Sequence, residues 1–60
     1  MRQFEWRSNG EVVATGYQDF DGSAVVTVIG MQPMGFFSVD AMVERFNALG
    51  ADYVMNWVEG

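Results

Sequence analysis

The sequence predicts a single small α+β domain over residues 1–60, with element order β-β-β-α-β and a four-stranded, mostly antiparallel sheet that carries one helix on one face. Three observations predict this class. Alternating apolar and polar residues open the chain, two turn dipeptides separate short β-rich stretches, and a helical stripe of apolar residues follows a serine. Because one helix covers only one face of a sheet, the expected architecture has two layers.

The first hairpin is predicted from an Asn-Gly dipeptide, which is typical of two-residue β-turns. Residues 2–7 alternate between apolar and polar side chains, and residues 11–17 provide the return strand after the turn. Across this turn Trp6 is expected to pair with Val13, and this register sorts the strands into two faces. The face of Trp6 then carries Phe4, Val13, Thr15 and Tyr17, and the opposite face carries Glu5, Arg7, Val12, Ala14 and Gly16.

The third strand is predicted over residues 24–31, which are rich in β-branched side chains and follow a second turn at Asp21-Gly22. If that turn has two residues, Val26 and Val28 join the face of Trp6. A longer loop shifts the register by one residue and exchanges the two faces. In the two-residue register, the face opposite the helix gains Val25, Thr27 and Ile29.

The helix is expected to follow a connector over residues 32–37, since Pro33 is unfavourable inside a strand. Ser38 is predicted to cap the helix and Gly50 to end it. Residues at helical spacing form its apolar stripe, which is expected to meet the face of Trp6. This stripe consists of Val39, Met42, Val43, Phe46 and Leu49.

The last strand is predicted over residues 52–59, where apolar side chains alternate again. A right-handed crossover from the third strand is expected to place it parallel to its neighbour, at the free edge of the first strand, in the spatial order 4-1-2-3. One of its faces carries Tyr53, Met55 and Trp57, and the other carries Val54, Asn56 and Val58.

The composition argues against an enzyme, because the chain contains no histidine, cysteine or lysine. These side chains carry most nucleophilic, acid–base and metal chemistry at neutral pH. Paired carboxylates could hydrolyse glycosides, but a general acid needs a pocket that raises its pKa, and a chain this short rarely has one. The acidic run from Asp19 lacks the acidic twelfth residue of a calcium loop, where Gly30 stands. No catalytic residue, metal site or cofactor is predicted.

The charge of the chain indicates which partners it attracts. Eight acidic residues and three arginines give a formal net charge of −5. Nucleic acids and anionic membranes both select clustered basic residues, so neither is an expected partner. No apolar run approaches the roughly 18 residues of a transmembrane helix. The absence of cysteine fits the reducing cytoplasm. The expected partner is therefore a protein, in particular a basic one or one that itself binds nucleic acid.

Two apolar features indicate a contact surface. The sheet face opposite the helix is expected to expose β-branched residues that no second layer covers. Residues 31–37 hold four large apolar side chains, Met31, Met34, Phe36 and Phe37, which either plug the end of the core or form an exposed anchor. The candidate partner-binding residues are Val12, Ala14, Val25, Thr27, Ile29, Met34, Phe36 and Phe37, with Asp40 and Glu44 as an acidic surface.

These observations predict a small acidic protein-binding module in the cytoplasm. It would act as a stand-alone regulator or inhibitor that blocks a functional surface of its partner. Such proteins are frequent in bacteriophages and mobile elements, an analogy of size and composition. Two alternatives stay open: a structural subunit that forms a homo-oligomer, with a homodimer as the simplest case, through its apolar sheet face, and an inhibitor that mimics nucleic acid with its carboxylates.

Overall fold

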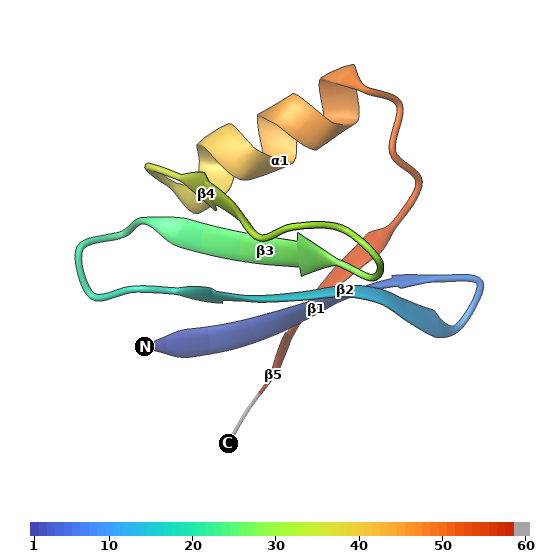
Figure 1. Cartoon of the computed structure of the whole chain (residues 1–60), viewed down its shortest axis with the longest axis horizontal. Helices are drawn as coiled ribbons and strands as arrows, with labels where there is room; N and C mark the ends of the chain where they lie inside the picture. Colours follow the sequence, from blue (N-terminus) through green and yellow to red (C-terminus); the bar gives the residue numbers. More distant parts are fainter. Residues whose placement is uncertain (59–60) are drawn as a thin grey trace.

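Residues 1–58, which the computed structural model describes, form one antiparallel sheet of five strands with a helix across one face (Figure 1). The predicted α+β class is confirmed, with one strand more than expected. Residue 59 of the predicted last strand lies outside the described residues. The elements are β1 (Arg2–Ser8), β2 (Glu11–Gln18), β3 (Ala24–Val28), β4 (Met34–Phe36), α1 (Val39–Ala48) and β5 (Val54–Val58).

The additional strand is β4, which lies in the segment predicted to be a connector. Strand β3 ends at Val28, and the amide of Met31 donates to the Val28 carbonyl at 2.9 Å in a tight turn. The returning chain then pairs with β3. Pro33 stands directly before β4 rather than inside it, at a position where its missing N–H removes no ladder hydrogen bond. The prediction was wrong because it treated this proline as the end of regular structure.

The direction of β5 also differs from the prediction. β5 lies beside β1, the predicted neighbour, but runs antiparallel to it. The helical crossover starts from β4, which runs opposite to β3, so it returns the chain parallel to β4. The spatial order is β4-β3-β2-β1-β5, and every neighbouring pair is antiparallel. The presence of β4 therefore reverses the direction of β5 relative to the prediction.

The β1–β2 hairpin contains a bulge that the sequence did not reveal. Its turn is as predicted: Asn9 and Gly10 have φ values of 53° and 81°, the left-handed conformations that a type I′ turn requires. The register shifts after the turn, so that Trp6 pairs with Ala14 and Val13 is an extra residue. The second half of β2 therefore has its two faces exchanged relative to the prediction.

The β2–β3 loop introduces a second shift. The amide of Asp19 donates to the Ser23 carbonyl at 2.8 Å, and the amide of Gly22 donates to the Asp19 carbonyl at 3.0 Å. Three residues, not two, lie between Asp19 and Ser23, and Gly22 has a φ of 91°, as is common in three-residue hairpin loops. Tyr17 consequently pairs with Val25. The bulge and the longer loop each shift the register by one residue, so together they leave the side chains of β3 on their predicted faces.

The helix begins and ends where its capping residues predict. The Ser38 hydroxyl oxygen accepts a hydrogen bond from the Ala41 amide at 3.0 Å. At the other end, Leu49 is the C-cap and Gly50 follows it with a φ of 75°. The amide of Gly50 donates to Asn47 and that of Ala51 to Phe46, the two bonds of a Schellman motif.

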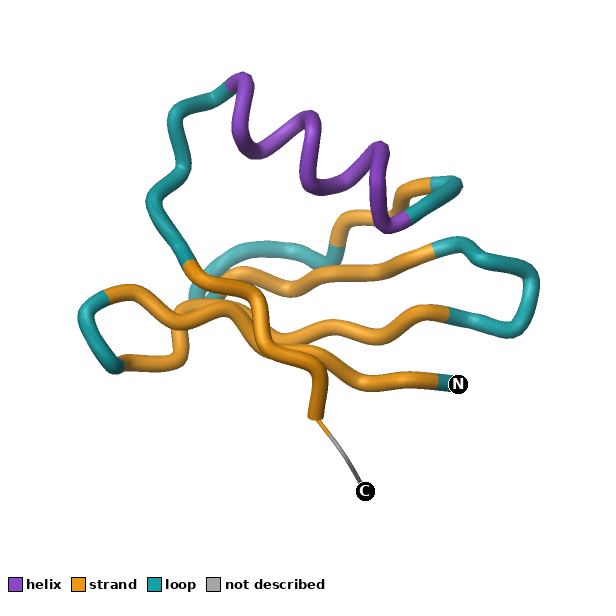
Figure 2. Tube along the Cα trace, turned by 180° about the vertical axis from the view of Figure 1, so that it is seen from behind, coloured by secondary structure: helices purple, strands orange, loops and turns teal. Residues whose placement is uncertain are grey.

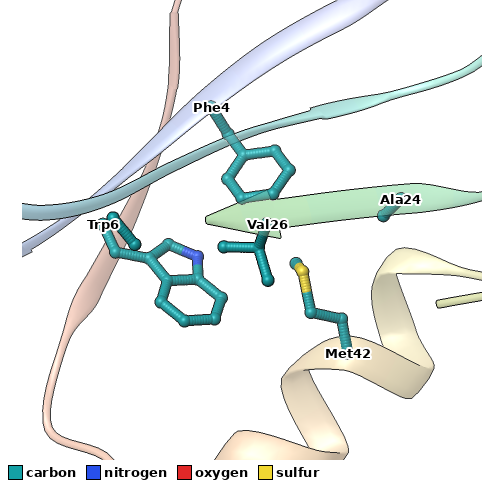
Figure 3. Packing of buried hydrophobic residues seen from close by; sticks show 6 residues of the cluster. Phe4, Trp6, Ala24, Val26 and Met42 are labelled. Carbon is teal, nitrogen blue, oxygen red and sulfur yellow. The ribbon is translucent and has the colours of Figure 1, made fainter. Parts of the chain in front are cut away.

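The core lies between α1 and the sheet, and Figure 3 shows Met42 reaching from the helix toward Val26 and Phe4. The predicted contact between Trp6 and Phe46 is confirmed, because their rings meet edge to face with centroids 4.7 Å apart. Trp6 also stacks on Tyr53 at 4.2 Å. The buried residues are Phe4, Trp6, Ala14, Ala24, Val26 and Met42.

Candidate interaction surfaces

The outer face is the surface of the sheet that α1 does not cover. A shallow depression of about 390 Å³ occupies its middle, lined by residues that include Thr15, Tyr17 and Val25. The register defines the members of the face as Val58, Gln3, Tyr17, Val25 and Gly35 in one row, Asn56, Glu5, Thr15 and Thr27 in the next, and Val54, Arg7 and Val12 in the third.

The outer face is electrically balanced and more polar than the sequence predicted. Its two charged residues pair with each other: Arg7 Nε lies 2.7 Å from Glu5 Oε1, and Arg7 also donates to the Gly10 carbonyl at 3.1 Å. An exposed pair of this kind adds little stability. Thr15 and Tyr17 lie on this face because of the bulge in β2. The face therefore offers mixed contacts rather than a continuous apolar patch.

The structure divides the predicted patch of β-branched residues. Val12, Val25 and Thr27 lie half-buried on the outer face, as expected. Ala14 does not, because the bulge turns it toward the helix, where it is fully buried. Ile29 is 70% exposed but lies beyond the end of β3, in the turn that leads to β4.

The predicted apolar connector splits between the core and the surface. Met34 and Phe36 belong to β4 and pack against the core, where the Phe36 ring lies 6.0 Å from that of Phe46. Both residues therefore follow the alternative in which the connector plugs the core. Phe37 is the next residue and is 85% exposed. Met31, in the turn before β4, is 59% exposed, so Met31 and Phe37 follow the exposed alternative.

Three exposed apolar side chains lie at one end of the sheet, which we call the apolar end: Met1, Phe20 and Phe37. The pairs Arg2–Gln18, Gln18–Ala24 and Ala24–Phe36 form the last row of the sheet at this end. In both Figure 1 and Figure 2, the N-terminus and the β2–β3 loop lie at one end of the sheet, and α1 starts above that same end. The exposed fractions are 64% for Met1, 90% for Phe20 and 85% for Phe37.

Met1 and Phe20 are members of this surface that are not among the candidates predicted from the sequence. The segment around Phe20 predicts only a turn at Asp21-Gly22. A large aromatic side chain inside an acidic turn was the available signal, because a ring at the tip of a hairpin loop has few core neighbours to pack against. The amide of Phe20 donates to Asp19 Oδ1 at 2.8 Å, and its side chain is 90% exposed.

Carboxylates flank the apolar end. Asp19 and Asp21 lie on either side of Phe20, and Asp40 stands in the first turn of α1, three residues after Phe37. Asp21 Oδ1 accepts hydrogen bonds from the Ser23 hydroxyl at 2.6 Å and the Ser23 amide at 2.9 Å. These bonds lower the pKa of Asp21, so its carboxylate is ionised at neutral pH. The candidate Glu44 is exposed one turn further along α1.

Two polar atoms inside the core lack a hydrogen-bond partner among the described residues. They are Trp6 Nε1 and the Tyr53 hydroxyl, whose rings stack on each other. Burial raises the pKa of Tyr53, because the phenolate would be desolvated. Both groups lie within the packed layer between sheet and helix, so they act on stability rather than on a ligand.

Other kinds of site find little support in residues 1–58. No three acidic side chains in this part of the chain come close enough together to hold a metal ion. The helix found there is too short to cross a membrane. Comparison of the chain with protein-family models, with curated proteins and with solved structures finds no match. The arguments for function therefore rest on the geometry of the outer face and the apolar end.

Proposed function

We propose that this protein is a small protein-binding module that regulates or inhibits a basic partner protein by covering a functional surface of that partner. The observation that carries the proposal is the apolar end, where Phe20 and Phe37 are 90% and 85% exposed on the same end of one sheet. Aromatic side chains are enriched at the centres of protein interfaces, surrounded by a polar rim. Here the rim consists of Asp19, Asp21 and Asp40.

The two exposed phenylalanine rings do not stabilise the fold, so the free energy of burying them is available to stabilise a complex. Neither ring belongs to the core cluster, whereas six of the nine aromatic residues of the chain lie in that cluster or pack against it. Fully burying one such side chain is worth about 1.5–3 kcal/mol. Two rings supply about 3–6 kcal/mol, a large share of the roughly 8 kcal/mol of a micromolar complex.

The charge of the protein supports a basic partner. With a net charge of −5 and carboxylates beside the two rings, the protein would attract a positively charged surface and accelerate the encounter. Acidic residues outnumber the arginines at the apolar end. Arg7 pairs with Glu5 on the outer face, and Arg45 lies in the last turn of α1. Arg2 is the arginine in the last row at this end, and its guanidinium lies over the Trp57 ring at 3.8 Å.

The test compares capture by the wild type with capture by a variant that carries both Phe20→Ala and Phe37→Ala. Because both rings are exposed, the variant should melt at the wild-type temperature but fail to retain the dominant partner identified by mass spectrometry. Leu49→Ala is the matched control, since Leu49 is 67% exposed at the C-cap of α1. The wild-type affinity for the purified partner should fall as salt is added.

Two outcomes would contradict the proposal. One is a double variant that retains the same partner with unchanged affinity. The other is a captured partner that is acidic and binds independently of salt. Loss of binding in the Leu49→Ala control would show that the contact lies at the C-terminal end of α1, away from Phe37.

A further inference from the structure

The two edges of the sheet differ in how they are protected against pairing with another strand. β4 has three residues, follows Pro33 directly, and is held under α1 by the contact of Phe36 with Phe46. β5 has five residues and pairs on one side only, with β1, among the described elements. Proteins usually block an open edge with charged residues, proline or a bulge. The sequence of β5 is Val-Met-Asn-Trp-Val, and its register with β1 is regular.

We infer that β5 is a self-association surface, on which two copies of this chain pair β5 to β5 antiparallel around a two-fold axis through Asn56. The pairing joins two five-stranded sheets into one continuous sheet. Each copy supplies the backbone donors and acceptors that its own β5 leaves unpaired at the edge. Dimers with two-fold symmetry are the commonest closed oligomers.

The sequence of β5 is complementary to itself in this register. Val54 lies opposite Val58 of the second copy, Met55 lies opposite Trp57, and Asn56 lies opposite its own copy. Directly opposed side chains on antiparallel strands are in contact, so the valines pair on the outer face and each methionine meets an indole on the helix side. The two asparagine amides can donate to and accept from each other. This register is the one that pairs all five residues of β5 with residues of β5 in the second copy.

The side chains that would be covered are accessible in the single copy. Val54 is 63% exposed and Val58 is 44% exposed, although both are apolar strand residues. No residue of β5 is charged, so no like charges meet at the contact. The remaining repulsion comes from the net charge of −5 on each copy, which acts at longer range. Salt screens such repulsion, so self-association should strengthen with salt, whereas binding to a basic partner should weaken.

The two-fold axis makes a single substitution a sharp test. Asn56→Lys places two positive charges opposite each other, and Asn56→Asp places two negative charges there, so each variant alone should be monomeric. An equimolar mixture of the two should form a heterodimer, because lysine then faces aspartate. Gly35→Lys is the matched control: it adds the same charge on the outer face at the β4 edge, where an added Cβ meets no atom within 4 Å.

Sedimentation velocity measures the result over a range of protein concentrations, in about 0.01 M and about 1 M salt, between which the screening length falls from about 30 Å to about 3 Å. Wild type and Gly35→Lys should be dimeric, more completely at high salt. An Asn56→Cys variant should form a disulfide-linked dimer under mild oxidation, because the chain has no other cysteine and the two Cα atoms would be within disulfide range.

A wild type that stays monomeric at every concentration and salt would overturn the inference. A dimer that survives in Asn56→Lys would overturn it as well, since the contact would then lie elsewhere. The inference does not rest on the proposed function. The variant that carries both Phe20→Ala and Phe37→Ala should dimerise like the wild type, so each proposal can fail without the other.

Discussion

The two faces of the sheet are built from the same strands, yet they differ in burial and in what they contribute to the fold. On the helix side, Phe4, Trp6, Ala14 and Val26 are each at most 2% exposed, and every side chain is constrained by its neighbours. On the outer face no residue is buried. The helix side therefore determines the fold, while the outer face tolerates substitution and is free to change with a binding partner.

Two glycines on strands test this contrast with the same substitution. An added Cβ at Gly16 would overlap the Val25 carbonyl oxygen and the Phe4 ring, so Gly16→Ala should destabilise the protein by about 3 kcal/mol or more. Gly35 has open space around it, and Gly35→Ala should leave stability unchanged or raise it by about 0.5 kcal/mol. Thermal melting followed by circular dichroism measures both. Equal melting temperatures for the two variants would show that the faces are not distinct.

Two phenylalanines, one packed against the core and one exposed, test the same difference by removing a side chain. Phe46 packs against both Trp6 and Phe36, so Phe46→Ala should cost about 3 kcal/mol, at the lower end of the range for a core aromatic because the ring is half-buried. Phe37→Ala should cost nothing measurable. Urea unfolding followed by tryptophan fluorescence gives both values. An unchanged midpoint for Phe46→Ala would refute the assigned packing face of the helix.

Tyr53 tests whether a buried polar group without a hydrogen-bond partner lowers the stability of the core. Its buried hydroxyl has no hydrogen-bond partner within residues 1–58, so Tyr53→Phe should stabilise the protein by about 1 kcal/mol. Since its pKa is raised from 10.0, the folded state favours the neutral phenol. Wild-type stability should therefore be complete below about pH 10 and fall as the pH rises through the folded pKa.

Urea unfolding at neutral and alkaline pH measures this effect. Tyr53→Phe should remove the alkaline loss of stability that comes from this residue. Tyr17→Phe, on the outer face, should keep it. A wild type whose alkaline loss persists unchanged in Tyr53→Phe would show that the buried hydroxyl is not its source.

The parts of the fold that could be predicted depend on short sequence signals. The turn at Asn9 and Gly10, the Ser38 cap and the alternation of β5 each follow from neighbouring residues, and all three are confirmed. The bulge at Val13 leaves no such signal, because valine is equally common in regular strands. The three-residue loop shifts the register a second time, so the predicted faces of β3 were right although those of β2 were partly wrong.

The candidate surface was harder to predict, because exposure depends on register and packing together. Ala14 was predicted on the outer face, but the one-residue bulge in β2 places it in the core. Met34 and Phe36 belong to β4 and pack against the core, and this strand was not predicted because Pro33 directly precedes it. Phe37 was identified and Phe20 was not, although the two have nearly the same exposure. Partner binding by these residues stays a prediction.

The position of β5 beside β1 has a consequence for folding kinetics. The β1–β2 hairpin closes over a short loop and can form early, whereas β5 must find a strand near the opposite end of the chain, which is the slowest kind of contact to make. Until it docks, β1 is the open edge of the growing sheet. The docking rate of the last strand therefore decides how long each newly folding molecule is vulnerable to aggregation.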